Sequence, residues 1–294
     1  MAKRLTNTRI RGKSKGKKIQ SVILTIILYI VAIQTVFPLI FLLINSFKPQ
    51  STIYSSPLTF KDFHIKYLLN AMEEIHIVRG VCNSMILTVL YVTLIILVSS
   101  LTAWMMLRCQ SKISNIIYYV YASAMLIPFQ SVIYPLMSFM DKLGLKNYWG
   151  LIIMYGGYGL SLSILLYYGF LKSISSSMEE AAMIDGANIF QIFFKVVFPM
   201  LRPITITIAI FNIVWIWNDY LLPYYVIGTE ERQRTITLEL YYAKLSNGTD
   251  LSVLFPAVLI SIIPILIIFL ILQKYIIRDI TTESAIKKHP PKKE

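Results

Sequence analysis

The stretch SSSMEEAAMIDGANIFQIFFKVVFPMLRP, Ser175–Pro203, lies between two long apolar segments. It contains two glutamates, an aspartate, a glycine and two prolines, whereas the flanking segments are almost wholly hydrophobic. Ionisable side chains are costly inside a bilayer, so such a stretch belongs outside the membrane. Its role therefore depends on whether the apolar segments around it are membrane spans.

The composition is that of a polytopic membrane protein. Of the 294 residues, 56% are hydrophobic and 15% are charged, whereas soluble domains carry about 25% charged residues. Six apolar runs exceed the roughly 18 residues that a spanning helix needs. They are Val22–Ile44, Val81–Leu107, Ile116–Met140, Trp149–Leu171, Ile204–Ile227 and Val253–Ile277. The third is the weakest, because Pro128, Gln130 and Pro135 interrupt it. We expect an all-α fold with six transmembrane helices.

The distribution of charge orients these helices. Six spans place both termini on one side, together with segments 108–115 and 172–203. That side carries 19 basic and 6 acidic residues, and the opposite loops carry 9 and 8. Loops rich in Lys and Arg stay in the cytoplasm. We therefore expect a basic cytoplasmic tail at 1–21, a membrane domain at 22–277 with a cytoplasmic loop at 172–203, and a cytoplasmic tail at 278–294.

The basic tail beside the first span has two interpretations, nucleic-acid binding and contact with anionic lipid. We favour membrane lipid as the partner, because polybasic segments next to a span bind anionic headgroups. The first apolar run has 23 residues, longer than the roughly 7–15 apolar residues of a cleaved signal peptide. We therefore expect it to be a retained helix.

Residue patterns for catalysis, metal binding or nucleotide binding are absent from the sequence. The three histidines, His64, His76 and His289, are scattered and do not have metal-ligand spacing. The tripeptide GKS at Gly12–Ser14 has Asn7 where a phosphate-binding loop needs glycine, and it lies in a basic tail. We expect no enzyme activity, no metal site and no cofactor bound by this chain.

The quoted stretch predicts two short helices joined at a glycine. The first helix should run from Ser177 to Asp185, with a capping box either between Ser176 and Glu179 or between Ser177 and Glu180. Gly186 permits the positive φ that ends a helix. Residues at i, i+3, i+4 and i+7 give this helix one narrow face with mainly small side chains; they are Met178, Ala181, Ala182 and Asp185.

The second helix should begin near Asn188 and end or kink at Pro199. Its apolar residues form a regular stripe, which suits packing against a membrane bundle. These residues are Ile189, Ile192, Phe193, Val196 and Val197. From the residues alone, the stretch is either an amphipathic loop that packs on its own protein or a bent segment that offers its other arm to a partner.

The pattern Glu180-Ala181-Ala182, Asp185-Gly186-Ala187, Phe193 and Pro199 resembles the EAA signature of ABC importer permeases. The segments IPFQSVIYPLMSFMDKLGLKNYWGLIIMYGG (Ile127–Gly157) and WNDYLLPYYV (Trp217–Val226) are similar to carbohydrate-uptake permeases, specifically to the maltose-type second permease subunit. The ending QKYIIRDITTESAIKK departs from the glycine-rich tail that is usual in that family, so no role is carried over to it.

The resemblance implies a transport task without catalysis. In such importers the EAA helix docks on a cytoplasmic ATPase subunit, which binds ATP and Mg²⁺. The implied partners are a homologous permease subunit, two ATPase subunits and an extracellular sugar-binding protein, in a bacterial cell membrane. The residues expected to act in ATPase coupling are Glu179, Glu180, Ala181, Ala182, Asp185, Gly186, Ala187, Phe193 and Pro199. In this reading Glu180 pairs with basic groups of the ATPase.

A substrate pathway is expected along the fifth span. At 100° per residue, Asn212, Trp215 and Asp219 share one sector with Thr205, and Asn218 borders it. An aromatic ring beside carboxamides and a carboxylate suits a sugar. The same residues also suit interhelical hydrogen bonds. Gln130, in the interrupted third span, is a further candidate for the pathway.

The function predicted is therefore the permease subunit of a binding-protein-dependent importer of sugars, with oligosaccharides favoured. The outer loops, Asn45–Gly80 and Gly228–Ser252, are the expected docking surface for the sugar-binding protein. One alternative is the same importer class with glycerol phosphate, a peptide or an amino acid as solute. Others are a secondary transporter driven by an ion gradient and a membrane signalling or scaffold protein.

Overall fold

The computed structural model describes residues 15–228, 230–248 and 250–288, and every regular element in these ranges is a helix. The prediction of an all-α fold is therefore confirmed. Four helices are long and apolar enough to cross a membrane. They are α1 (Lys15–Asn45), α4 (Ile77–Cys109), α7 (Tyr148–Leu171) and α14 (Leu251–Lys288). The basic residues at positions 1–14 lie outside the described residues.

Two bent pairs of helices also pass the same test of length and composition, so the number of candidate spans rises to six if each pair is counted as one span. The expected third span is not one helix. It divides into α5 (Lys112–Ala124) and α6 (Phe129–Lys142), which meet at 110°. Pro128 is the physical reason, because proline disfavours helical backbone in the residue before it. Pro128 then occupies the N-cap of α6 in an extended conformation.

The fifth span also differs from its predicted bounds. The helical run Ile189–Met200 meets α11 (Arg202–Asn218) at 76°. The helix ends at Asn218 instead of continuing to Ile227, because Asp219 has an extended conformation. A separate short helix, α12 (Leu221–Ile227), follows.

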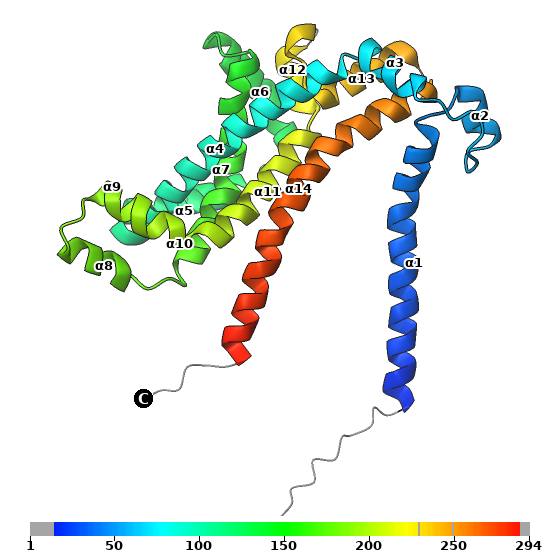
Figure 1. Cartoon of the computed structure of the whole chain (residues 1–294). Helices are drawn as coiled ribbons and strands as arrows, with labels where there is room; N and C mark the ends of the chain where they lie inside the picture. Colours follow the sequence, from blue (N-terminus) through cyan, green and yellow to red (C-terminus); the bar gives the residue numbers. More distant parts are fainter. Residues whose placement is uncertain (1–14, 229, 249, 289–294) are drawn as a thin grey trace, which may run out of the picture.

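The two segments expected to be outer loops are largely helical. The first contains α2 (Gln50–Ser55) and α3 (Lys66–Glu74). The second contains the 3-10 turn η2 (Glu231–Gln233) and α13 (Ile236–Asn247). These helices gather at one end of the molecule (Figure 1). The start of α1 and the described end of α14 both point away from them, as an even number of spans requires.

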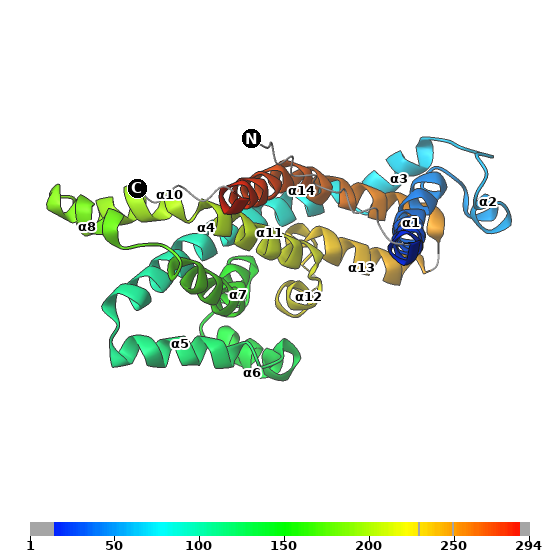
Figure 2. The same ribbon diagram turned by 90° about the horizontal axis from the view of Figure 1, so that it is seen from below.

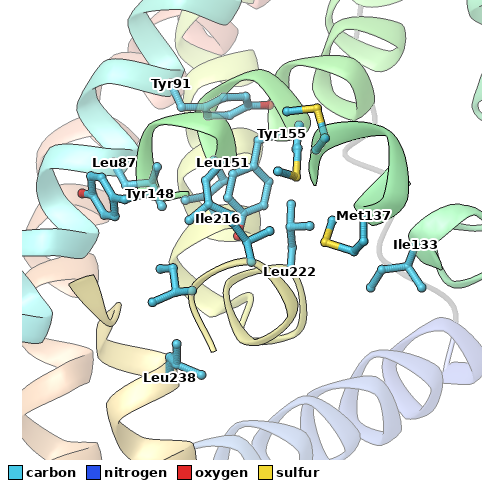
Figure 3. Close-up of a cluster of buried hydrophobic side chains, with 14 of the residues drawn as sticks. Leu87, Tyr91, Ile133, Met137, Tyr148, Leu151, Tyr155, Ile216, Leu222 and Leu238 are labelled. Carbon is cyan, nitrogen blue, oxygen red and sulfur yellow. The ribbon is translucent and has the colours of Figure 1, made fainter. Parts of the chain in front are cut away.

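The bundle packs around α4 and α7, with α11 and α14 alongside (Figures 1 and 2). One buried cluster joins residues from α4, α6, α7, α11, α12 and α13, including Tyr91, Tyr155 and Ile216 (Figure 3). A second cluster holds the inward side of the 172–203 segment and includes Trp104 and Phe193.

Helix α1 stands apart from the bundle (Figure 1). None of its most apolar window, within residues 20–45, is buried within the chain. Its end packs on α14 through the rings of Phe41 and Phe255, whose centroids lie 6.0 Å apart. A helix with so long an apolar stretch and so little intrachain packing leaves most of its surface to lipid or to another membrane protein.

Candidate functional site

The bent loop, which we define as residues 172–203, begins with helix α8 (Ser177–Ile184). Gly186 follows it with φ +79°, in the left-handed region. The amide of Gly186 donates to the carbonyl of Met183, and the amide of Ala187 donates to that of Ala182. This pair of bonds is the Schellman ending, in which glycine supplies the positive φ. The predicted helix and glycine turn are therefore confirmed.

The second arm begins at Asn188, as predicted, but with a capping box that the sequence interpretation missed. The amide of Gln191 donates to Asn188 Oδ1, and the amide of Asn188 donates to Gln191 Oε1, both at 2.9 Å. The arm then runs through α9 (Ile189–Gln191), a π-helical stretch from Ile192 to Val197, and α10 (Phe198–Met200).

The expected kink follows Pro199 and occurs at Leu201, between α10 and α11. Proline lacks the amide proton that a continuous helix needs, and a π-helical turn is one way to accommodate a disturbed ladder. On this arm Ile192, Phe193 and Val197 are buried in the second cluster, whereas Ile189 is exposed. Complete burial of the Phe193 side chain contributes about 1.5–3 kcal/mol, which anchors the arm to the bundle.

The predicted capping box at the start of α8 is wrong for both serine–glutamate pairs. Ser176 occupies the N-cap without a side-chain cap bond, and the amide of Ser177 donates to Ser175 Oγ instead. The hydroxyl of Ser176 donates to Glu180 Oε1 at 2.6 Å. Glu179 cannot cap its own helix, because its carboxylate is bound to α4.

Glu179 is buried at the junction between the bent loop and α4. Its carboxylate accepts hydrogen bonds from Arg108 Nη2 at 2.6 Å and from Arg108 Nε at 3.0 Å. Trp104 Nε1 donates to the same carboxylate at 2.9 Å. The Glu179 side chain is 4% exposed and that of Arg108 is 29% exposed. The ring of Trp104 also contacts Phe193, with centroids 5.3 Å apart.

Apart from Glu179 and Ala182, most of α8 is exposed, including Glu180 and Met183, which also line a cavity beside α4. Glu180, Ala181 and Asp185 face solvent, whereas Ala182 is half-buried against the second cluster. Ile184 is 87% exposed and Met183 is 56% exposed. The exposed surface of α8 therefore combines the predicted small and acidic residues with large apolar side chains. Exposed apolar side chains that gather between charged ones are typical of a protein-interaction surface.

A cavity of about 500 Å³ separates the bent loop from α4. Its α4 wall includes Trp104, Arg108 and Cys109, and its loop wall includes Glu180 and Ile189. The loop is thus fixed to α4 at Glu179 but not packed against it along its whole length. This arrangement leaves an open space between α8 and the end of α4.

Asn212 lies in the interior of the bundle, as expected, and joins three helices. Tyr91 of α4 donates to Asn212 Oδ1 at 2.5 Å, and Asn212 Nδ2 lies 3.3 Å from Ser163 Oγ on α7. The same nitrogen donates to the carbonyl of Ile208 at 2.8 Å. Gly159 makes this approach possible, because a Cβ there would lie 1.7 Å from the Tyr91 hydroxyl oxygen.

Asp219 forms a second junction. Its Oδ2 accepts from the Tyr155 hydroxyl at 2.8 Å, and its Oδ1 accepts from the amide of Leu221 at 3.0 Å. Its carbonyl accepts from Thr237 Oγ1 of α13 at 2.7 Å. Asp219 therefore connects α7, the start of α12 and α13, so its carboxylate and carbonyl already have partners within the chain.

Trp215 is the pathway candidate that is both exposed and beside a cavity. It is 40% exposed, and its ring packs edge-on against Tyr91 and Tyr155 with centroids 6.4 and 5.5 Å away. Together with Asn212 and Tyr158 it lines a cavity of about 290 Å³. Asn218 and Gln130 are exposed but do not line this cavity. The structure thus brings Asn212 and Trp215 together and leaves the other two apart from them.

A further polar cluster lies at the α13 end of α4 and was missed from the sequence. Arg79 Nη2 lies 3.2 Å from Glu239 Oε1, and Arg234 Nη1 lies 3.6 Å from Glu239 Oε2. Burial raises the pKa of Glu239, and the two arginines oppose that rise. Asn83 Nδ2 donates to the carbonyls of Arg232 and Arg234, both at 2.9 Å.

Comparison with known proteins identifies the family. The family model described as "Binding-protein-dependent transport system inner membrane component" matches residues 95–282, which include the bent loop and α11. The chain belongs to this family. The permease is accordingly a transporter subunit of the inner membrane and not an enzyme.

Curated relatives cover most of the permease. It is 35% identical over 263 residues to the "Probable starch degradation products transport system permease protein AmyC" of Thermoanaerobacterium thermosulfurigenes, over 89% of this chain and 96% of the relative. It is 32% identical over 263 residues to the "Melibiose/raffinose/stachyose import permease protein MelC" of Bacillus subtilis, over 88% of this chain and 95% of the relative.

A solved structure supports the fold of the permease. The chain matches a chain of the crystal structure of a bacterial ABC transporter involved in the import of the acidic polysaccharide alginate. The TM-score is 0.74 at 23% identity, and the match covers 89% of this chain and 98% of the other. At this identity the likeness shows that the two chains share a fold.

Proposed function

We propose that this permease forms half of the membrane pathway of an ABC importer of sugars, with oligosaccharides as substrates. The observation that carries the proposal is the bent loop, which has one arm buried in the bundle and the other exposed. Its exposed arm suits docking to a separate ATPase, and its buried arm leads directly into α11. ATP and Mg²⁺ would bind to the ATPase subunits and not to this chain.

The docking surface for the ATPase is the exposed side of α8. Met183 and Ile184 supply apolar area, and Glu180 and Asp185 supply negative charge for basic groups of the partner. Ser176 holds the Glu180 carboxylate at the surface through the 2.6 Å hydrogen bond. The loop then lies in the cytoplasm, and so do both termini.

A homologous permease subunit completes the pathway. The support is α1, whose apolar window has no burial within the chain. In an importer with two permeases, a second bundle offers such a helix a protein surface to pack on. The extracellular sugar-binding protein docks at the opposite end of the molecule, where the expected outer loops contain the helices α3 and α13.

Sugar is the solute class that the relatives and the cavity beside Trp215 favour. The curated relatives are named for starch degradation products and for melibiose, raffinose and stachyose. The half-exposed ring of Trp215 beside the cavity suits the apolar face of a sugar ring. Asn212 borders the same cavity, but its carboxamide is already hydrogen-bonded to Tyr91, Ser163 and the carbonyl of Ile208. In this pathway Asn212 therefore shapes the cavity wall.

Purification of the complex from native membranes tests the proposal. We expect a second permease and an ATPase to copurify with this chain. Reconstituted with its binding protein, the complex should import radiolabelled maltotriose, raffinose or stachyose only when ATP is present inside the vesicles. A chain that purifies alone, or uptake that follows an ion gradient and ignores ATP, would contradict the proposal.

A further inference from the structure

Helix α4 is bound at both ends by ion pairs to helices that are not membrane spans. Arg79, the third residue of α4, pairs with Glu239 of α13. Arg108, the residue before the last, pairs with Glu179 of α8. The 29 positions between the two arginines correspond to about 44 Å of helix. A single unbroken element therefore connects the bent loop with the opposite end of the molecule.

Both carboxylates are buried, although both arginines are partly exposed. The Glu179 and Glu239 side chains are each 4% exposed, and those of Arg108 and Arg79 are 29% and 33% exposed. A buried carboxylate that loses its partner is left as an uncompensated charge, so such a pair resists separation. The partner helix at each junction, α8 or α13, is thus held to α4 more firmly than a surface ion pair would hold it.

Each junction has a second attachment. At the loop end, Trp104 donates to Glu179, and its ring packs on Phe193 of the other arm. At the α13 end, Asn83 donates to two carbonyls before α13, and Ser84 Oγ accepts from the amide of Ile236 at 2.8 Å. Movement of either partner helix therefore acts on α4 through several bonds at once.

We propose that α4 moves as one rigid helix and transmits displacement of α8 to α13. In this inference Glu179 and Arg108 are positioning residues: Glu180 and Ile184 meet the ATPase, and Glu179 passes the motion to α4. Arg79, Asn83 and Glu239 pass it on to the face where the binding protein docks. The inference rests on the proposed function, because it assumes that an ATPase moves α8.

If α4 transmits the displacement, nucleotide binding to the ATPase should change the surroundings of Cys82. This exposed residue lies between Arg79 and Asn83, at the end of α4 that contacts α13. The test uses the complete complex in proteoliposomes, with Cys109→Ser so that Cys82 is the sole cysteine of this chain. The rate at which a maleimide labels Cys82 is measured with ADP, with ATP and Mg²⁺, and with ADP and vanadate trapped after hydrolysis of ATP. Labelled chains are resolved by mass.

In the otherwise unchanged chain, we expect the labelling rate to differ between the ADP state and the vanadate-trapped state. Glu179→Gln and Arg108→Gln should abolish that difference and lower uptake about 2- to 30-fold, the range expected for residues on a coupling route. ATP hydrolysis should continue. The exchanged pair, Glu179→Arg with Arg108→Glu, should recover part of the nucleotide response, which a merely misfolded loop would not do. The matched control is Asp141→Asn, which neutralises an exposed carboxylate on α6. Its Cys82 labelling should respond to nucleotide as in the parent.

Two results would overturn the inference while the proposed function stands. One is a full nucleotide response of Cys82 in Glu179→Gln. The other is a transporting parent complex in which Cys82 labelling ignores nucleotide. If the parent complex shows no ATP-dependent uptake, the proposed function and the inference fail together.

Discussion

The carboxylate of Glu179 lies 2.6 Å from the guanidinium of Arg108, 71 positions away in the sequence, whereas its neighbour Glu180 is exposed. Two adjacent glutamates of one short helix thus have opposite surroundings. Glu179 fixes the bent loop to α4, and Glu180 remains available to a partner. The two residues should therefore fail in different ways when they are changed.

Glu179→Ala should lower the stability of the protein, and Glu180→Ala should not. Breaking a buried ion pair from one side costs about 3–5 kcal/mol, because the other charge is left unpaired. Surface substitutions usually stay within about 0.5 kcal/mol. Thermal unfolding of the detergent-solubilised variants measures both. Equal melting temperatures for the two variants would contradict the assignment of Glu179 to a buried junction.

Gly186→Val should abolish ATP-dependent uptake while the protein still inserts in the membrane. A side chain in the left-handed region costs about 1–2 kcal/mol, and no heavy atom lies within 4 Å of the added Cβ. The substitution therefore changes the turn and leaves packing intact. Gly144 is the matched control, since it has φ +67° and equally open surroundings outside the bent loop. Loss of uptake in Gly144→Val to the same extent would remove the special role of the turn.

Gly159→Ala should disrupt the junction of α4, α7 and α11. The new Cβ would lie 1.7 Å from the Tyr91 hydroxyl oxygen, and forced overpacking typically costs about 1–3 kcal/mol. Gly157→Ala on the same helix meets nothing within 4 Å and should be neutral or stabilising. Adding Tyr91→Phe to Gly159→Ala should recover part of the loss, because it removes the clashing oxygen. Melting temperature and uptake rate are measured for all three variants. A Gly159→Ala variant with the parent's melting temperature and uptake rate would contradict the close packing of Gly159 against Tyr91.

The two native cysteines provide a test of membrane orientation. Cys82 and Cys109 are both exposed and lie near opposite ends of α4. With the termini in the cytoplasm, a membrane-impermeant maleimide added to intact cells should label Cys82 and spare Cys109. Inside-out vesicles should show the reverse. Labelling of Cys109 in intact cells would place the bent loop outside and contradict the ATPase proposal.

Much of the fold follows from local sequence. Runs of more than about 18 apolar residues dictate spans, and the bent loop carries its own signals in Gly186 and Pro199. Pro128 predicts that the helix breaks there, but it does not predict the 110° angle between α5 and α6. The helices α3 and α13 were missed because their sequences mix polar and apolar residues, and much of their stability comes from packing on α4 and α14.

The site was less predictable than the fold. The bond between Tyr91 and Asn212 joins residues 121 positions apart, and no local pattern reports such a contact. Trp104 and Arg108 at i, i+4 near the end of a span were a usable signal for a carboxylate partner. Asn188 and Gln191 had capping-box spacing and were overlooked. The serine–glutamate spacing at α8 led to a wrong prediction of a capping box. The Glu179 carboxylate is instead bound by Arg108 and Trp104.

The most direct test of the account places a photo-crosslinking amino acid at Ile184, which is 87% exposed on α8. Irradiation of the native complex, followed by mass spectrometry, identifies what touches the bent loop. The account predicts an adduct with an ATPase subunit, and a weaker one after Gly186→Val. Adducts with lipid alone, or with the extracellular binding protein, would contradict it.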